Sequence, residues 1–103
     1  MKVLFKDANK NYLELMDIEN SNTAIHNLID GYYRCVHIGN NVLLLCDEDG
    51  IAKELNINYF DKVYGRILGN VIFCGMGRED FDSLSDEQIQ YVSKYLQCTI
   101  RIK

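Results

Sequence analysis

The chain has 103 residues, a formal net charge of −4, and 48% hydrophobic against 25% charged residues. This length predicts one domain over residues 1–103 with a single modest core. The net negative charge argues against binding along a nucleic-acid backbone, which requires a basic surface. We expect a cytoplasmic protein that does not enter the membrane, because no apolar run is long enough to span a bilayer or to form a signal peptide.

The N-terminal third predicts two strands and a helix. The apolar runs Val3–Phe5 and Tyr12–Ile18 are separated by a polar turn, which is typical of a hairpin. Ser21 and its Asn neighbours offer N-cap oxygens to a short helix, and Gly31 occupies a position where helices end in the left-handed conformation. The apolar stripe of this helix consists of Ala24, Ile25, Leu28 and Ile29.

A second hairpin is predicted to form the centre of the sheet. Its two apolar runs, Tyr32–Ile38 and Val42–Cys46, flank Gly39-Asn40-Asn41. Gly and Asn tolerate the positive φ that tight hairpin turns require, so the two-residue loop is either Gly39-Asn40 or Asn40-Asn41. Both faces of these strands are largely apolar, which predicts that other elements cover the hairpin on both sides.

The alternation of side chains along these two strands predicts which residues share a face of the sheet. Both choices of loop lead to the same assignment. One face carries Tyr33, Cys35, His37, Val42, Leu44 and Cys46, and the other face carries Arg34, Val36, Ile38, Leu43 and Leu45.

The second half of the chain begins with a segment of weak pattern. We expect Ile51–Asp61 to be irregular with one helical turn, followed by a short strand at Val63–Ile67 and a buried strand at Asn70–Gly75. Ser85, with Gln88 three residues later, forms a capping box that predicts the start of the last helix.

A final alternating segment, Cys98–Lys103, predicts the last strand. The predicted order of elements is therefore β-β-α-β-β-loop-β-α-β. This order favours an α+β fold, in which one mixed, mostly antiparallel sheet has two helices packed on it.

The cysteines and the histidine of the predicted strands do not indicate a catalytic or metal site. Cys35, His37, Cys46 and Cys74 would offer zinc ligands, but the sequence has no CxxC or HxxxH spacing, and buried free thiols are common in protein cores. A nucleophilic pair of Cys35 and His37 would need an oxyanion hole and an orienting group, and no motif supplies either. We therefore expect no catalytic residue, metal or cofactor, and we favour a binding protein over an enzyme.

Tyrosine, arginine and asparagine are the side chains that we expect to bind a ligand. Tyr and Arg dominate binding hot spots, and they stack on bases or grip phosphate groups. Asn side chains would read a base edge or a ribose. The candidate ligand-binding residues are Tyr32, Tyr33, Arg34, Asn40, Asn41, Asn58, Tyr59, Arg66 and Arg78.

Several short segments, in their order, resemble a family of small uncharacterised proteins that carries only a domain-of-unknown-function label. The segments are MKVLF at the start, Gly31-Tyr32, Leu45–Gly50, Leu55 with Asn58, Gly69–Gly75 and Phe81–Ile89. Members of the family occur in phages, plasmids and other mobile elements of Gram-positive bacteria. The family often has Asn at the position of Asp47 and Pro ahead of the position of Asn58, so the chain departs from its pattern there.

This resemblance implies an accessory gene of a mobile element that is expressed in the bacterial cytoplasm, and it implies no catalytic residues. Together with the Tyr and Arg candidates, it leads to our first hypothesis. The protein would be a non-enzymatic binding protein that counteracts host defence by sequestering a small nucleotide signal. A homo-oligomer is compatible with this hypothesis.

Acidic residues lead to a second hypothesis, in which the protein inhibits a host nuclease or defence effector by direct contact. Electrostatic complementarity with a basic partner would carry the interaction. The two acidic clusters consist of Asp47, Glu48 and Asp49 and of Glu79, Asp80 and Asp82.

Overall fold

The computed structural model describes all residues from 1 to 103. Its elements are β1 (Lys2–Lys6), β2 (Tyr12–Asp17), α1 (Asn22–Ile29), β3 (Tyr33–Gly39), β4 (Val42–Asp47), β5 (Ile57–Asp61), β6 (Gly65–Leu68), β7 (Val71–Met76), β8 (Phe81–Asp82), α2 (Asp86–Leu96) and β9 (Thr99–Ile102). These elements form the α+β fold that the sequence predicts, and they follow its predicted order with extra short strands. Neither helix is long and apolar enough to cross a membrane.

The main sheet has the strand order β3-β4-β7-β1-β2-β9, and the short strand β8 pairs with β7 off this path. β9 runs parallel to β2, whereas the other neighbouring strands are antiparallel. β7 joins the two predicted hairpins, because one of its sides pairs with β4 and the other with β1. The strand predicted at Asn70–Gly75 therefore lies in the middle of the sheet.

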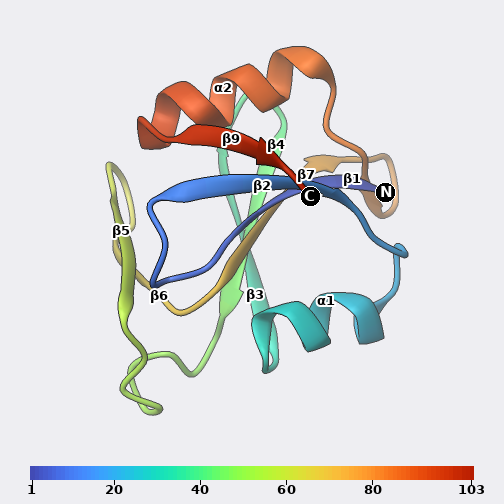
Figure 1. The fold of residues 1–103 in the computed structure, drawn as a ribbon. Helices are drawn as coiled ribbons and strands as arrows, with labels where there is room; N and C mark the ends of the chain where they lie inside the picture. The colour runs from blue at the N-terminus through green and yellow to red at the C-terminus, as the bar shows by residue number, and fades with distance from the viewer.

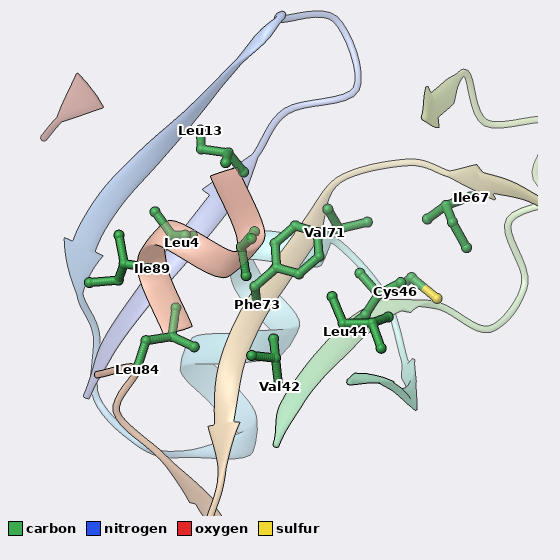
Figure 2. Close-up of a cluster of buried hydrophobic side chains, with 12 residues drawn as sticks. Leu4, Leu13, Val42, Leu44, Cys46, Ile67, Val71, Phe73, Leu84 and Ile89 are labelled. Atoms are coloured by element: carbon green, nitrogen blue, oxygen red, sulfur yellow. The ribbon is translucent and has the colours of Figure 1, made fainter. Parts of the chain in front are cut away.

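Helices cover both faces of the sheet (Figure 1), as expected from strands that are apolar on both sides. α2 packs on one face through Ile89 and Val92, and α1 packs on the other through Ile25 and Ile29. Figure 2 shows the cluster beneath α2, with the ring of Phe73 near its centre. The faces of the central strands are thus occupied, which leaves the ends and edges of the sheet for binding sites.

The central hairpin turns at Asn40-Asn41, both of which have positive φ (51° and 55°). Gly39 pairs with Val42, so the second of the two predicted loops is present. A bulge between His37 and Gly39 then shifts the pairing of the two strands by one residue.

This bulge makes the predicted face assignment wrong, because a one-residue shift moves every side chain of β3 to the opposite face. In the structure, Arg34 lies opposite Cys46 and Val36 lies opposite Leu44, and these pairs are on the face covered by α2. Cys35 lies opposite Leu45 on the face covered by α1. Cys35 and Cys46 therefore do not share a face.

The two ends of α1 follow from local hydrogen bonds. Ser21 is the N-cap, and its hydroxyl accepts the N–H of Ala24 at 3.1 Å. The left-handed residue at the other end is Asp30 (φ 63°), not Gly31 as the sequence suggested. A Cβ at position 31 would meet the ends of the Lys53 and Asp47 side chains, so a larger residue there would disturb the ion pair between them.

The start of α2 also holds the central hairpin in place. Ser85 and Gln88 form the predicted capping box. The Gln88 Nε2 also donates to the carbonyls of Asn40 and Asn41, at 3.0 Å each. The helix cap and the hairpin turn therefore stabilise each other.

Residues 57–68 form a separate two-stranded ribbon, β5–β6. The prediction of irregular structure for Ile51–Asp61 is wrong from Ile57 onwards, and the strand predicted at Val63–Ile67 begins later, at Gly65. Hydrogen bonds and packing from distant parts of the chain hold this ribbon, so its short strands have little signal of their own in the sequence. In Figure 1 the ribbon stands beside one end of the main sheet.

Candidate functional site

A buried carboxylate ties the ribbon β5–β6 to α2. Asp61 is 6% exposed and accepts hydrogen bonds from the hydroxyls of Tyr59 (2.7 Å) and Tyr95 (3.1 Å). It also accepts the backbone N–H groups of Val63 (2.9 Å) and Tyr64 (3.1 Å). Burial alone would raise the pKa of Asp61, but these hydrogen bonds outweigh burial and hold the pKa below its ordinary value. Asp61 is therefore a charged anchor for the ribbon.

The ribbon is also tied to the edge strand β3. The Tyr64 hydroxyl donates to the backbone carbonyl of His37 at 3.0 Å. Tyr59 and Ile67 pair across the two strands and pack against the cluster beneath α2. The next cross-strand pair, Phe60 and Arg66, points the other way, and Phe60 is 70% exposed. The ribbon thus presents Arg66 at a fixed place near β3.

Arg34 of β3 and Arg66 of β6 line the same cleft, which we call the arginine cleft. Its volume of about 400 Å³ falls within the range of small-molecule sites. Neither guanidinium donates a hydrogen bond within the protein. Neither forms an ion pair, because the one ion pair of the molecule joins Lys53 and Asp47. Each arginine therefore offers all five N–H donors to a ligand.

Carboxylates line the arginine cleft as well. Glu48 and Asp49 belong to the loop that follows β4, and this loop forms one wall. Asp47 has a different role, because its carboxylate is buried, pairs with the Lys53 ammonium at 2.7 Å and accepts the N–H of Asp49 at 2.7 Å. Asp47 therefore shapes the loop, while Glu48 and Asp49 remain exposed as hydrogen-bond acceptors.

A second recess adjoins the arginine cleft, because Glu48 lines both. Tyr32 in this recess is 70% exposed and meets the His26 ring edge-on, with 5.2 Å between the ring centroids. Tyr33 lines the recess too, but its hydroxyl already donates to Asn22 Oδ1 at 2.7 Å. The Tyr32 ring is thus the one available for stacking on a ligand.

Five of the predicted ligand-binding residues lie outside the arginine cleft and its adjoining recess, and three of these five are in turns. Asn40 and Asn41 form the turn of the central hairpin, at the end of β4 that is remote from the arginine cleft. Arg78 lies in the turn between β7 and β8. The structure therefore does not bring Asn40, Asn41 and Arg78 together with Arg34 and Arg66.

Asn58 and Tyr59 line a different cavity, bounded by the turn between β1 and β2, by β5 and by the start of β9. Asn58 is buried, and its Nδ2 donates to the carbonyls of Lys6 (2.9 Å) and Gly69 (2.8 Å). The Tyr59 hydroxyl donates to Asp61, and burial, followed by this bond, raises the pKa of Tyr59 far above its ordinary value. Both residues help to hold the ribbon in place.

The two acidic clusters lie at opposite ends of the paired strands β4 and β7. Glu48 and Asp49 follow β4 at one end, and Glu79, Asp80 and Asp82 follow β7 at the other. The five paired residues between these ends span about 13 Å. The clusters therefore form two separate patches, and the buried Asp47 belongs to neither surface.

The thiols and the imidazole of the strands are dispersed. Cys46 and Cys74 are buried on different faces of the sheet, and Cys35 is exposed on β3. Burial raises the pKa of Cys74 to about 12, which keeps this thiol protonated. No three His, Cys, Asp or Glu residues are grouped closely enough to hold a metal ion.

Three residues important for these sites were not among the predicted candidates. Phe60 lies opposite Arg66, Asp61 anchors the ribbon, and Lys6 lines the cavity of Asn58. Phe60 and Asp61 fall in the segment that the sequence suggested to be irregular. Lys6 is the last residue of β1, and the pattern of this strand drew attention only to its apolar residues. The adjacent aromatic pair Tyr59-Phe60 was the one available signal for the ribbon.

Comparison with known proteins gives a family match over nearly the whole chain. The family model described as "Domain of unknown function (DUF3846)" matches residues 1–97, from the first residue through the end of α2. No curated protein and no solved structure matches the chain. The matched range includes every residue that lines the arginine cleft.

Proposed function

We propose a function for this chain from the premise that it belongs to the DUF3846 family of domains of unknown function. The protein is a non-enzymatic binding protein of a phage or mobile element, and it acts in the cytoplasm of the bacterial host. It counteracts host defence by sequestering a small nucleotide signal in the arginine cleft. Several short segments of the chain, taken in their order along the sequence, resemble proteins of mobile elements, and this resemblance supports the setting.

The observation that carries the proposal is the convergence of two unpaired guanidiniums on one cleft. Arg34 and Arg66 come from distant parts of the chain, and neither forms an ion pair with a protein carboxylate. Arginine binds phosphate oxygens through pairs of parallel N–H donors, which gives both charge and geometry. A phosphate group would therefore be bound by both side chains at once.

The remaining groups of the site fit the other parts of a nucleotide. Glu48 and Asp49 accept hydrogen bonds, and the hydroxyls of a ribose and the amino groups of a base donate them. The exposed ring of Tyr32 lies in the adjoining recess, where a base would stack. Stacking of this kind contributes on the order of 1–3 kcal/mol per base. On this proposal the ligand leaves the site chemically unchanged.

Isothermal titration calorimetry with a panel of mononucleotides, dinucleotides and cyclic dinucleotides tests this proposal. The wild-type protein should bind at least one of them, and Arg34→Met or Arg66→Met should weaken that binding by about tenfold or more, because a hydrogen bond to a charged group contributes roughly 1.5–3 kcal/mol. Arg78→Met is the matched control, since it removes the same charge outside the cleft and should leave the affinity unchanged.

Two results would contradict the proposal. In the first, folded wild-type protein binds no nucleotide of the panel. In the second, Arg78→Met weakens binding as much as Arg66→Met, which would indicate general charge attraction. Loss of inhibition of a host nuclease on reversing the charge of Glu79, Asp80 and Asp82 would instead support the protein–protein inhibitor.

A further inference from the structure

A second cavity, separate from the arginine cleft, lies where the turn between β1 and β2 meets the ribbon. Its volume is about 810 Å³, it opens to solvent, and it shares no lining residue with the arginine cleft. Lys6, Lys10 and Asn58 are among the residues that line it, and none of the lining residues is acidic. We call it the lysine–asparagine cavity. Lys6 and Lys10 bring positive charge to this cavity in a chain with a net charge of −4, and the acidic residues Asp7 and Glu14 lie near them.

The side chain of Asn58 leaves one buried oxygen without a partner. Its two Nδ2 protons donate to the carbonyls of Lys6 and Gly69, which fixes the orientation of the amide. Rotating the amide by half a turn would place its oxygen against these two carbonyl oxygens. Asn58 is 8% exposed, and Oδ1 has no hydrogen-bond partner in the protein. A buried acceptor in this state is normally paired with a donor of a bound molecule, water included.

Lys6, in contrast, has hydrogen-bond donors without an acceptor. Its residue is 4% exposed, and its ammonium makes one hydrogen bond, to the backbone carbonyl of Asn58 at 3.2 Å. Two of its three N–H donors are therefore free. Burial lowers the pKa of Lys6, while Cys98 and Asp7 act in the opposite direction. An anion bound next to the ammonium would keep it charged.

These groups define what a ligand must carry. It needs anionic oxygens for Lys6 and Lys10, and it also needs a proton to donate to Asn58 Oδ1. A phosphate that retains a P–OH group provides both, whereas sulfate at neutral pH has oxygens but no proton. The unpaired acceptor thus distinguishes between two anions of the same size and shape.

We propose that the lysine–asparagine cavity binds a protonated phosphate group, with Lys6 and Lys10 donating to its oxygens and its P–OH group donating to Asn58 Oδ1. Inorganic phosphate and a phosphate monoester share this chemistry. The site is independent of the arginine cleft. Asn58 and Tyr59, which the sequence grouped with the arginines, belong to this second site.

Calorimetric titration of the protein at pH 6 with inorganic phosphate, glycerol phosphate and sulfate tests the proposal. Phosphate should bind at least about tenfold more tightly than sulfate, because sulfate leaves the Asn58 oxygen unpaired. Tighter binding of glycerol phosphate than of inorganic phosphate would identify a monoester as the ligand, and the reverse order would identify inorganic phosphate. Either order supports the site.

Substitutions of single residues show where on the protein the phosphate binds. Lys6→Met keeps the buried aliphatic chain but removes the ammonium, and it should abolish phosphate binding. Lys10→Met changes an exposed residue and should weaken binding several-fold, which keeps the test valid even where Lys6→Met fails to fold. Lys103→Met, at the other end of β9, is the matched control and should have no effect. Arg34→Met should have none either, which separates this site from the proposed nucleotide site.

Three results would overturn the inference. If only charge mattered, sulfate would bind as tightly as phosphate, so equal affinities for the two anions would refute the role of the Asn58 oxygen. An equal loss of affinity in Lys10→Met and Lys103→Met would show that the anion does not occupy the cavity. Absence of phosphate binding up to about 10 mM would show that water alone satisfies these groups.

Discussion

Replacing Asp61 by Asn tests how the ribbon that carries Arg66 is held in place. The carboxylate accepts hydrogen bonds from Tyr59, Tyr95 and two backbone N–H groups at 2.7–3.1 Å. Asn keeps one oxygen for the backbone donors but places an NH₂ group against a tyrosine hydroxyl that now donates. The variant therefore loses the charge-assisted character of these bonds and at least one tyrosine bond.

The expected cost of Asp61→Asn is about 2 kcal/mol, since a hydrogen bond to a charged group contributes roughly 1.5–3 kcal/mol and a neutral one about half of that. For a domain of this size, this cost lowers the midpoint of thermal unfolding by roughly 10 °C. Circular dichroism during heating at pH 7 measures the shift. An unchanged midpoint would refute the role of Asp61 as the anchor of the ribbon.

The pH dependence of this difference gives an independent test. The pKa of Asp61 in the folded protein lies below its ordinary value, so the carboxylate stabilises the fold fully above the unfolded pKa, near 3.9. This stabilisation is lost as the pH falls through the folded pKa. The advantage of the wild type over Asp61→Asn should therefore shrink on acidification below about pH 4. A constant advantage from neutral to acidic pH would contradict the argument.

Three further substitutions test the fold. Phe73→Ala removes a fully buried ring at the centre of the cluster beneath α2. It should lower the free energy of unfolding, measured in urea, by about 3–5 kcal/mol. A loss below about 1 kcal/mol would contradict the packing of this ring. Gly39→Ala should destabilise the folded protein by at least about 1 kcal/mol, because φ at this position is +102° and a Cβ would meet the Tyr91 hydroxyl. Unchanged stability in this variant would indicate that the bulge lies elsewhere. Ser85→Ala should lower stability by about 1 kcal/mol through loss of the capping box. Thermal unfolding measures this cost against the control Thr23→Ala, which removes an exposed hydroxyl that makes no hydrogen bond, and equal effects would count against the cap.

Local signals account for what the sequence predicted correctly. The capping box of Ser85 and Gln88 and a turn within Gly39-Asn40-Asn41 depend on hydrogen bonds and dihedral angles within a few residues, so they are visible in the sequence itself. The sequence left two loops open for this turn, and the structure has the one at Asn40-Asn41. The buried strand around Phe73 was likewise visible as a continuous apolar run. These elements were enough to predict the fold class.

The register of the central hairpin was not visible, because both of its faces are apolar. Exchanging the two faces of β3 leaves the pattern of apolar residues nearly unchanged. The bulge before Gly39 is therefore not visible in the alternation of apolar and polar residues. The strand β5 was missed for a related reason. Its Asn58 and Asp61 are poor strand residues by propensity, and the hydrogen bonds that hold them reach Lys6 and Tyr95, far away in the sequence.

The candidate site was predictable in chemistry but not in geometry. Arg34 and Arg66 were singled out because arginine grips phosphate, yet their convergence depends on the position of the ribbon. Asn40, Asn41 and Arg78 have the same chemistry and lie elsewhere. Residue type alone therefore does not distinguish the residues of a cleft from those of a turn.

The central claim is that the arginine cleft sequesters a nucleotide, and mass spectrometry of heat-released small molecules tests it most directly. Wild-type protein and the double variant Arg34→Met/Arg66→Met are exposed to extracts of phage-infected bacteria, washed and heated. The account predicts a stoichiometric nucleotide, chemically unchanged, from the wild type and none from the folded double variant. Absence of any nucleotide from folded wild-type protein, or equal amounts from both proteins, would contradict it.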